Sequence, residues 1–365
     1  MEKMRAWFCY SKREEGKGMA SKVYYSKRID SETIRAVFEK ALADAKRKIT
    51  RGDEVAIKVH FGEKGNTRYV SPGHIRPVIE ALKPLEGQVF LTDANTLYRG
   101  MRLNATDHLN IAKEHGFEAL KTKIVIADGQ SGEEEEEVGI PGRIFSKVKV
   151  ARRIARANAI IVISHFKGHI LFGFGGAIKN LGMGCGSRAG KLEMHSKIKP
   201  YVNADCISCG QFVENCTADA ISMQDDEKAV IDPGRCIGCA ECIAICCNEA
   251  IEIPWHGATS LEAMERCAEY ALGAAKGKTC VCVNFVNHIT KDCDCMPDSE
   301  VIGKDVGLVA SADPVACDQA SFELVFKNER NVDIFKKATH VDGTHVTRYG
   351  ATIGLGEIHY TLVEL

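Results

Sequence analysis

The chain has no excess of charge of either sign. Its 365 residues carry 48 Lys and Arg against 49 Asp and Glu, a formal net charge of −1. Proteins that bind nucleic acid or an anionic membrane usually show a basic excess. The chain also has no run of about 18 apolar residues, the length a membrane-spanning helix needs. We therefore expect neither nucleic acid nor a membrane as its partner.

An apolar segment of the secretory type is also missing from the start of the sequence. The 16 cysteines are therefore more typical of metal ligands in a reducing compartment than of disulfides, and we expect a cytoplasmic protein. Residues 1–18 show neither helical nor strand periodicity and precede a second methionine, Met19. We interpret them as a tail, either upstream of the true start or a short ordered segment.

One cysteine is missing from a doubled motif. The downstream copy, CIGCAECIAIC, has the x2, x2, x3 spacing that binds an iron–sulfur cubane. The upstream copy, CISCGQFVENC, begins 30 residues earlier and has Phe212 where the third cysteine should stand. The cysteines present are Cys206, Cys209 and Cys216 upstream and Cys236, Cys239, Cys242 and Cys246 downstream.

The fourth cysteine of each such motif binds the other cluster in two-cluster ferredoxins. By that rule one [4Fe–4S] cluster has a complete ligand set, namely Cys216, Cys236, Cys239 and Cys242. The second set is one thiolate short and consists of Cys206, Cys209 and Cys246. It would hold a [3Fe–4S] cluster, a [4Fe–4S] cluster with another ligand such as Cys247, or nothing. Mononuclear zinc is the alternative for the whole array, but zinc sites use paired C-x2-C units without a further cysteine.

Short apolar runs rich in Val and Ile alternate with helical stretches. The pattern predicts strands at 53–62, 87–95, 123–129 and 158–168, and helices at 74–85 and 108–117. After residue 254 it predicts a helix at 260–275 and strands at 279–286 and 306–313. This order predicts an α/β fold with a mainly parallel sheet and helices on both faces. We expect the glutamate run at 133–137 to be a solvated loop.

Residues 200–254 interrupt the α/β pattern. Each cysteine motif is followed by Ala-Ile in the same register, Ala220-Ile221 and Ala250-Ile251, which marks an internal repeat. We expect a small α+β domain of the bacterial ferredoxin type. It would be inserted between two parts of the α/β domain, residues 19–199 and 255–365.

The residues that close the predicted strands are unusually polar. Ligands of open α/β sheets bind beyond the carboxyl ends of the strands, so these side chains are candidates for chemistry. The candidates at strand ends are His60, Asp93, His165, His169 and Asp313, and those in the stretch after the fourth strand are Lys179, Cys185 and His195. Imidazole and thiolate groups suit zinc, iron or nickel, although a lone histidine is more often structural. The glycines of GFGGAIKN match neither the dinucleotide nor the Walker spacing, so a structural turn is favoured over phosphate binding.

Cys185 has two further interpretations, a reactive thiol or the missing cluster ligand. The segment KDCDC concentrates two thiols and two carboxylates after a predicted strand. Alternation would place Cys293 and Cys295 on one face and the carboxylates on the other. Packing hardly explains such a density, so we expect these thiols to act as metal ligands or as a redox pair.

The assembled motifs resemble the domain of unknown function 362 family of iron–sulfur centre proteins. The resemblance rests on VAIKVHFGEKGNTRYVSP, TDANTLYRG, HFKGH, GFGGAIKNLGMGC, GKLEMH, the cysteine pair of motifs, ITKDCDC and ADPVACDQAS. It spans about Ser21 to Ser321 and implies an iron–sulfur insertion in an α/β domain. It implies no reaction, and Phe212 departs from the family's usual cysteine.

Two functions fit the sequence. The first is an iron–sulfur oxidoreductase in which the insert passes electrons to a site at the strand ends. The second is a non-catalytic electron carrier or cluster-bearing module that docks a redox partner protein. A third, a mononuclear metal site controlled by the clusters, is weaker. The sequence leaves open the substrate, the electron donor and the number of subunits.

Overall fold

A central sheet organises the α/β part of the chain. The computed structural model describes residues 20–224, 228–255 and 257–365, so the predicted tail at 1–18 lies outside the described residues. The strands, in order across the sheet, are β16 (Tyr360–Glu364), β1 (Ser21–Ser26), β15 (Gly307–Ser311), β14 (Thr279–Val286), β7 (Ala159–His165), β2 (Glu54–Lys58), β3 (Gln88–Asp93) and β4 (Lys123–Ile126). From β14 to β4 the strands run parallel, whereas β15 pairs antiparallel with both of its neighbours. The predicted α/β fold with a mainly parallel sheet is confirmed.

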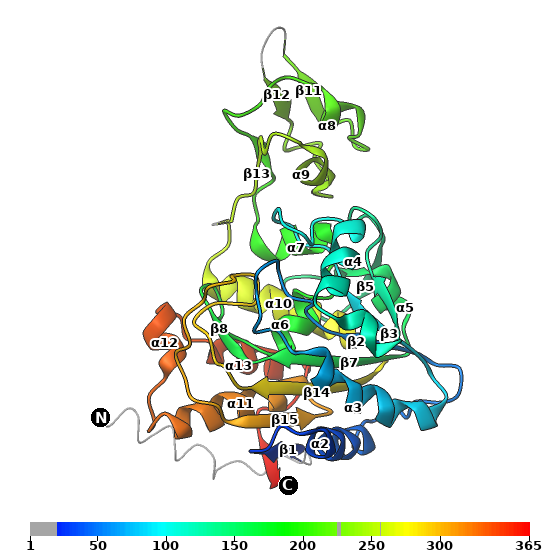
Figure 1. Ribbon diagram of the computed structural model, residues 1–365. Coiled ribbons are helices and arrows are strands. Elements are labelled where there is room, and N and C mark those ends of the chain that lie inside the picture. The colour runs from blue at the N-terminus through cyan, green and yellow to red at the C-terminus, as the bar shows by residue number, and fades with distance from the viewer. Residues whose placement is uncertain (1–19, 225–227, 256) are drawn as a thin grey trace.

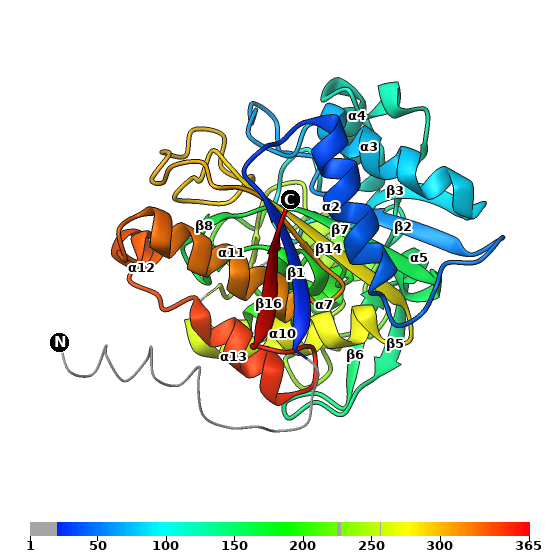
Figure 2. The same ribbon diagram turned by 90° about the horizontal axis from the view of Figure 1, so that it is seen from below.

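Each face of the sheet carries its own hydrophobic core. Successive residues of a strand point to opposite faces, so Ile161 and Ile163 of β7 join one core while Ile160 and Val162 join the other. Both faces are covered, and β7 is buried along its whole length. The first face is covered by α2 (Ser31–Ala43) and α3 (Pro72–Leu82), and the second by α6 (Ala177–Gly182), α10 (Ser260–Ala275), α11 (Pro314–Asn328) and α13 (Thr344–Thr352). Figure 2 shows α2 and α3 on one side of the β1–β16 edge and α11 and α13 on the other.

Smaller elements surround the sheet. The helices α4 (Ala105–Glu114), α5 (Arg152–Arg156), α7 (Arg188–His195) and α12 (Ile334–Thr339) lie beside it, with 3-10 turns at Lys83–Leu85 and Phe117–Leu120. Two hairpins are formed by β5 (Glu135–Gly139) with β6 (Lys147–Ala151), and by β8 (Lys167–His169) with β9 (Gly173–Gly175).

The glutamate run is not the solvated loop that its charge predicts. Glu135 to Glu137 open strand β5, and Lys147 on β6 binds Glu137 at 2.9 Å. Arg156 of α5 contacts Glu136. These basic neighbours offset the repulsion between adjacent carboxylates, so the run can form a strand.

The insert repeats one backbone pattern twice. Its elements are β10 (Tyr201–Val202), α8 (Gln211–Glu214), β11 (Ile221–Met223), β12 (Ala229–Ile231), α9 (Glu241–Ile245) and β13 (Ile251–Glu252). Corresponding positions of the two halves share left-handed backbone, in the pairs Ser208 and Gly238, Gly210 and Ala240, and Asp219 and Glu249. The internal repeat inferred from Ala220-Ile221 and Ala250-Ile251 therefore extends to conformation.

Two residues of the α/β domain join the hydrophobic core of the insert. That core contains Phe212, Ile243 and Ile251 together with Leu97, from the loop after β3, and Leu192, from α7. Figure 1 shows α9 of the insert directly above α7. The insert is thus held against the carboxyl side of the sheet by apolar contacts as well as by its two connections.

The two connections of the insert run side by side. The N–H of Lys197 donates to the carbonyl of Gly257 at 3.4 Å, and Lys197 also pairs with Glu262 at the start of α10. A side chain at Gly257 would collide with the Ser196 hydroxyl, so this close approach needs glycine. Among the described residues, no helix combines the length and the apolarity needed to cross a membrane.

Candidate functional site

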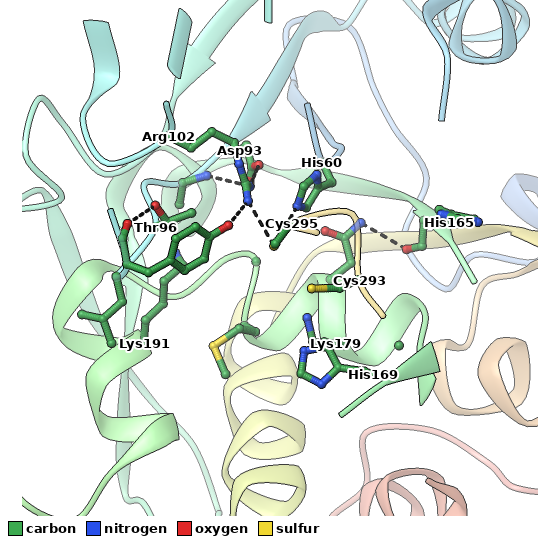
Figure 3. Close-up of a pocket in the computed structure, with 18 of the residues that line it drawn as sticks. His60, Asp93, Thr96, Arg102, His165, His169, Lys179, Lys191, Cys293 and Cys295 are labelled. Atoms are coloured by element: carbon green, nitrogen blue, oxygen red, sulfur yellow. Dashed lines mark hydrogen bonds and ion pairs between the residues drawn. The ribbon is translucent and has the colours of Figure 1, made fainter. Parts of the chain in front are cut away.

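A cavity of about 240 Å³ opens at the carboxyl ends of the parallel strands. Lys58, Asp93 and His165 reach it from the last positions of β2, β3 and β7, and His60 lies two residues after the end of β2. The expected site residues that line it are His60, Asp93, His165, His169, Lys179, His195, Cys293 and Cys295. Figure 3 shows the two cysteines between Arg102 and His60 on one side and Lys179 and His169 on the other. The structure therefore brings together most of the candidates that lie far apart in the sequence.

Asp93 is held as a carboxylate by three basic side chains. Lys58 Nζ lies 2.8 Å from one of its oxygens, and Arg102 Nη1 and His108 Nε2 each lie 3.4 Å from the other. Burial alone would raise the pKa of Asp93, but Lys58, His108 and Arg102 outweigh it and hold the pKa well below its ordinary value. With its oxygens occupied, Asp93 positions Lys58 and Arg102 rather than accepting protons.

Cys295 receives two polar hydrogens. Arg102 Nη2 donates to its sulfur at 3.2 Å, and His60 Nε2 lies 3.5 Å away. The N–H of Gly62 donates to His60 Nδ1 at 3.0 Å, so the proton of a neutral His60 ring must sit on Nε2, facing the sulfur. Burial, and then the charge of Arg102, lowers the pKa of His60, which favours this neutral ring.

Cys293 and Cys295 share one proton. A hydrogen bond from the Cys293 thiol, opposed by burial and aided by Arg102 and His60, lowers the pKa of Cys295 well below its ordinary value. The same hydrogen bond and burial raise the pKa of Cys293 well above its ordinary value. Cys295 is therefore the more acidic of the two thiols.

Asp294 faces away from the two thiols, as the predicted alternation requires. Its oxygens lie 2.7 Å from His165 Nδ1 and 2.8 Å from Lys167 Nζ. The second nitrogen of His165, Nε2, lies 2.9 Å from the carbonyl of Asn287. Burial would raise the pKa of Asp294, but Lys167 and His165 outweigh it and lower the pKa. His165 and Lys167 thus anchor the cysteine loop.

Two lysines of the cavity, Lys179 and Lys191, have no ion-pair partner among the described residues. Lys179 Nζ lies over the ring of Phe172, and Lys191 Nζ donates to the carbonyl of Gly186 at 2.6 Å. Among the described residues neither ammonium has a carboxylate within ion-pairing distance, and Asp93 is the one carboxylate that lines the cavity. His195, whose Nδ1 is buried without a partner in the described part of the chain, lies beside them.

Two candidates lie outside the cavity. Cys185 is buried beneath it with its thiol 3.7 Å from the carbonyl of Asn180, and burial raises its pKa to about 12. Neither placement nor protonation suits Cys185 to act as a reactive thiol. Asp313 caps α11 by accepting from the N–H groups of Val315 and Ala316. The expectation that Asp313 lies at the site is therefore wrong. Because β15 runs antiparallel to its neighbours, Asp313 follows it at the amino ends of the parallel strands, away from the cavity.

The N–H groups that follow the glycine-rich turn before α6 bind a side chain of the protein and are not available to an anionic ligand. The carboxylate of Asp318 accepts from the N–H groups of Ala177 at 2.6 Å and Ile178 at 2.9 Å. A side chain at Gly176 would collide with that carboxylate. The structural interpretation of GFGGAIKN is therefore the better one.

Several residues that line the cavity are not predicted from the sequence. Arg102 and Tyr98 lie in the loop between β3 and α4, Lys191 lies on α7, and Trp255 closes the insert. The motif TDANTLYRG was recognised, but no periodicity marks which of its side chains turns inward. Lys191 stands four residues before His195, one helical turn away, which is the one signal that could have found it.

The four cysteines of the expected complete cluster line one cavity in the insert: Cys216, Cys236, Cys239 and Cys242. Burial, and then Cys239, Cys236 and Cys216, raises the pKa of Cys242 to about 12, as expected where thiols crowd together. At equivalent positions of the two halves, a backbone N–H donates to a cysteine sulfur. Ala220 donates to Cys216 at 3.3 Å, and Ala250 donates to Cys246 at 3.2 Å. These donors fit thiolate ligands, so the residues present suit an iron–sulfur cluster.

The second ligand set is less compact. Cys206 packs against the core of the insert, Cys209 is exposed and Cys246 is buried. Asn248 contacts the carbonyl of Asp205, so the chain segments of the set lie together, but no described cavity joins the three sulfurs. Phe212 is buried in the core instead, beside the first cavity. Within the described residues, no three His, Cys, Asp or Glu side chains are arranged to hold a single metal ion.

Comparisons with known proteins give a family and several matches to solved structures. The model of the family described as "Domain of unknown function (DUF362)" matches residues 55–323. No curated protein matches the chain. Seven chains of solved structures match, among them the lactate racemase apoprotein from Thermoanaerobacterium thermosaccharolyticum, 18% identical with a TM-score of 0.34. That match covers 48% of this chain and 41% of the racemase, so the chain spans less than half of that protein's length.

Proposed function

The chain belongs to the DUF362 family, and we propose that it is an iron–sulfur oxidoreductase of a reducing cytoplasm, in which the insert passes electrons to the cavity at the strand ends. The family description names no reaction, so the proposal rests on the site. Its three parts are a cysteine array suited to iron and sulfide, a substrate-sized cavity, and a short path between them.

One observation carries the proposal: Tyr98 and Trp255 line both the main cavity and the neighbouring cavity that contains Cys246. Two aromatic side chains therefore stand between a predicted cluster ligand and the proposed reaction site. Electron transfer slows steeply with distance, so such proximity is what an electron relay needs. A cluster used only for folding would have no reason to adjoin a polar cavity.

The chain's own residues have separate tasks in this function. Clusters bound by the insert would supply electrons one at a time. Lys179 and Lys191 attract a negatively charged substrate, because their charge is not balanced within the cavity. Asp93 fixes Arg102, and Asp294 fixes the cysteine loop, so the reacting groups are held before substrate arrives.

Anaerobic purification followed by iron and acid-labile sulfide counts, with electron paramagnetic resonance of the reduced protein, tests the proposal. We expect at least one reducible [4Fe–4S] centre, lost on Cys239→Ser but kept in Cys185→Ser. A protein that binds only zinc, or iron that cannot be reduced, would overturn the proposal.

The second function, an electron carrier that docks a redox partner protein, is favoured by one feature of the insert. Ile207 and Ile237, each between the first two cysteines of a motif, are 62% and 57% exposed. An apolar side chain beside a cluster is a natural contact for another redox protein. Replacing Lys179 separates the two functions, because a carrier should transfer electrons equally well without it.

A further inference from the structure

The two thiols of the cavity are placed for reaction rather than for packing. Cys293 and Cys295 both line the cavity, one residue apart, while Asp294 between them turns inward to Lys167 and His165. The loop is therefore fixed from behind, and its sulfur atoms face the open side. Two thiols one residue apart on the wall of the same cavity can close to a disulfide.

The environment of the two sulfurs is unequal. Cys295 accepts from Arg102 at 3.2 Å and faces the Nε2 hydrogen of His60, whereas no arginine or histidine of the described residues donates to the Cys293 sulfur. Arg102 is itself fixed by Glu63 and Asp93, so its position does not depend on a substrate. Cys295 is therefore the nucleophile, and Cys293 is the partner that completes the exchange.

The charge of the cavity indicates what would meet this nucleophile. Lys58, Arg102 and Lys167 are neutralised by Asp93, Glu63 and Asp294. Lys179 and Lys191 have no ion-pair partner among the described residues, although Asp128 and Asp93 act on Lys191 from a greater distance, and the orphan Nδ1 of His195 lies beside them. An anionic group of the substrate would satisfy all three.

We propose that Cys293 and Cys295 form a redox-active dithiol that reduces the sulfur–sulfur bond of a small anionic disulfide held by Lys179 and Lys191. This inference deepens the proposed function, on which it rests for the supply of electrons.

The exchange balances in three steps. The Cys295 thiolate attacks one sulfur of the substrate, forms a mixed disulfide and releases the other half as a thiolate. Cys293 attacks Cys295 Sγ, closes the internal disulfide and releases the second half, which takes the Cys293 proton. Two electrons, which clusters held by the cysteines of the insert would supply singly, and one proton would restore the Cys293 thiol and the Cys295 thiolate.

The first two steps, which need no electrons from the insert, can be tested with two model disulfides. The probes are the dianionic 5,5′-dithiobis(2-nitrobenzoate) and the neutral 2,2′-dipyridyl disulfide, added anaerobically to the full-length protein. Cleavage after Lys291 and Lys304 gives a peptide whose only cysteines are the two in question, so mass spectrometry can follow them alone.

We expect the wild-type peptide to lose two hydrogens and carry no probe, because the internal disulfide closes. Cys293→Ser should stop at a stable mixed disulfide on Cys295, and Cys295→Ser should react at least about tenfold more slowly. Lys179→Gln should slow the anionic probe about tenfold and leave the neutral one unchanged, while the exposed Lys327→Gln should alter neither.

Equal reactivity of the two single cysteine variants would overturn the assignment of Cys295, and an unreactive wild-type peptide would overturn the dithiol. Equal slowing of both probes in Lys179→Gln would overturn the anionic substrate. The same preparation is counted for iron and sulfide. A reducible cluster with an inert dithiol would refute this inference alone, whereas a reactive dithiol without a cluster would refute the proposed function.

Discussion

Lys191 and Leu192 are neighbours on helix α7 that contact two different regions of the molecule. Lys191 lines the polar cavity at the strand ends, and Leu192, which is 3% exposed, belongs to the hydrophobic core of the insert. Successive residues of a helix point about 100° apart, so one short helix can contact both regions. The position of the insert is thereby coupled to the position of the cavity's cations.

Replacing Leu192 with Ala should loosen the insert. The lost contacts are worth about 2–3 kcal/mol for a buried leucine. Hydrogen exchange should become faster for amides between 200 and 254, with the iron content unchanged. Leu261→Ala is the matched control, because Leu261 is 52% exposed on α10. Equal exchange in the two variants would show that Leu192 does not hold the insert.

Replacing Phe212 with Cys should raise the iron content. The residue stands at the position of the absent third cysteine, and the new thiol would complete the ligand set of Cys206, Cys209 and Cys246. Anaerobic reconstitution followed by iron and sulfide counts measures the gain. Phe212→Ala opens the same space without a thiol and should show none. An unchanged count in Phe212→Cys would mean that another residue, with Cys247 the nearest, already supplies the ligand.

Sulfate binding to the cavity should weaken as the pH rises above about 8. Burial lowers the pKa of Lys191 from 10.5 to about 8, although Asp128 and Asp93 oppose the shift. Above that pH the lysine is neutral and attracts an anion less. Calorimetric titration with sulfate at pH 7 and pH 9 measures the change. Lys191→Gln should remove the pH dependence, whereas Lys179→Gln should weaken binding and keep it.

The lowered pKa of Lys191 should make the folded protein more stable as the pH rises, although it weakens sulfate binding over the same range. Between about pH 8 and 10.5 the unfolded chain keeps a proton on Lys191 that the folded protein has lost. The contribution of Lys191 to the free energy of unfolding should therefore increase across this interval. A sulfate affinity that rose with pH together with stability would contradict the assigned pKa.

Asp294→Asn should destabilise the α/β domain. The change leaves Lys167 and His165 without their buried carboxylate, which typically costs about 3–5 kcal/mol. Because the pKa of Asp294 is lowered, its stabilising effect is complete above about pH 4 and is lost in more acidic solution. Calorimetry at pH 7 and pH 3.5 should thus show a smaller deficit at the lower pH.

Asp292→Asn provides the comparison. Asp292 accepts from Ser299 at 3.2 Å on the less buried side of the loop, and its loss should cost about 1 kcal/mol. If the two variants unfolded at the same temperature, Asp294 would not be the anchor of the cysteine loop.

Much of the fold follows from local patterns in the sequence. The runs at 159–165 and 279–286 are apolar on both faces, which marks strands buried between two layers of helices. The edge strand β16 lacks such a run, since one side of an edge is solvated. It forms because β1, which is itself paired with β15, offers it a partner, and no local pattern reveals this.

The site could be predicted in part for the same reason. Residues at the ends of parallel strands converge, so the pattern predicts that His60, Asp93 and His165 lie close together, and all three line the cavity. Asp313 was misplaced because the direction of β15 depends on its neighbours. Arg102, which polarises Cys295, lies in a loop whose shape is set by Glu63 and Tyr98, so no spacing in the sequence identifies it.

The adjacent connections of the insert have an evolutionary consequence. Because Ser196 and Gly257 meet, the chain leaves and re-enters the α/β domain at almost one point. A segment joined in this way can be acquired, exchanged or lost as a cassette while the host retains its own sheet and both of its cores. Ancestors and descendants of this protein could therefore keep the cavity and its dithiol while drawing electrons from different modules.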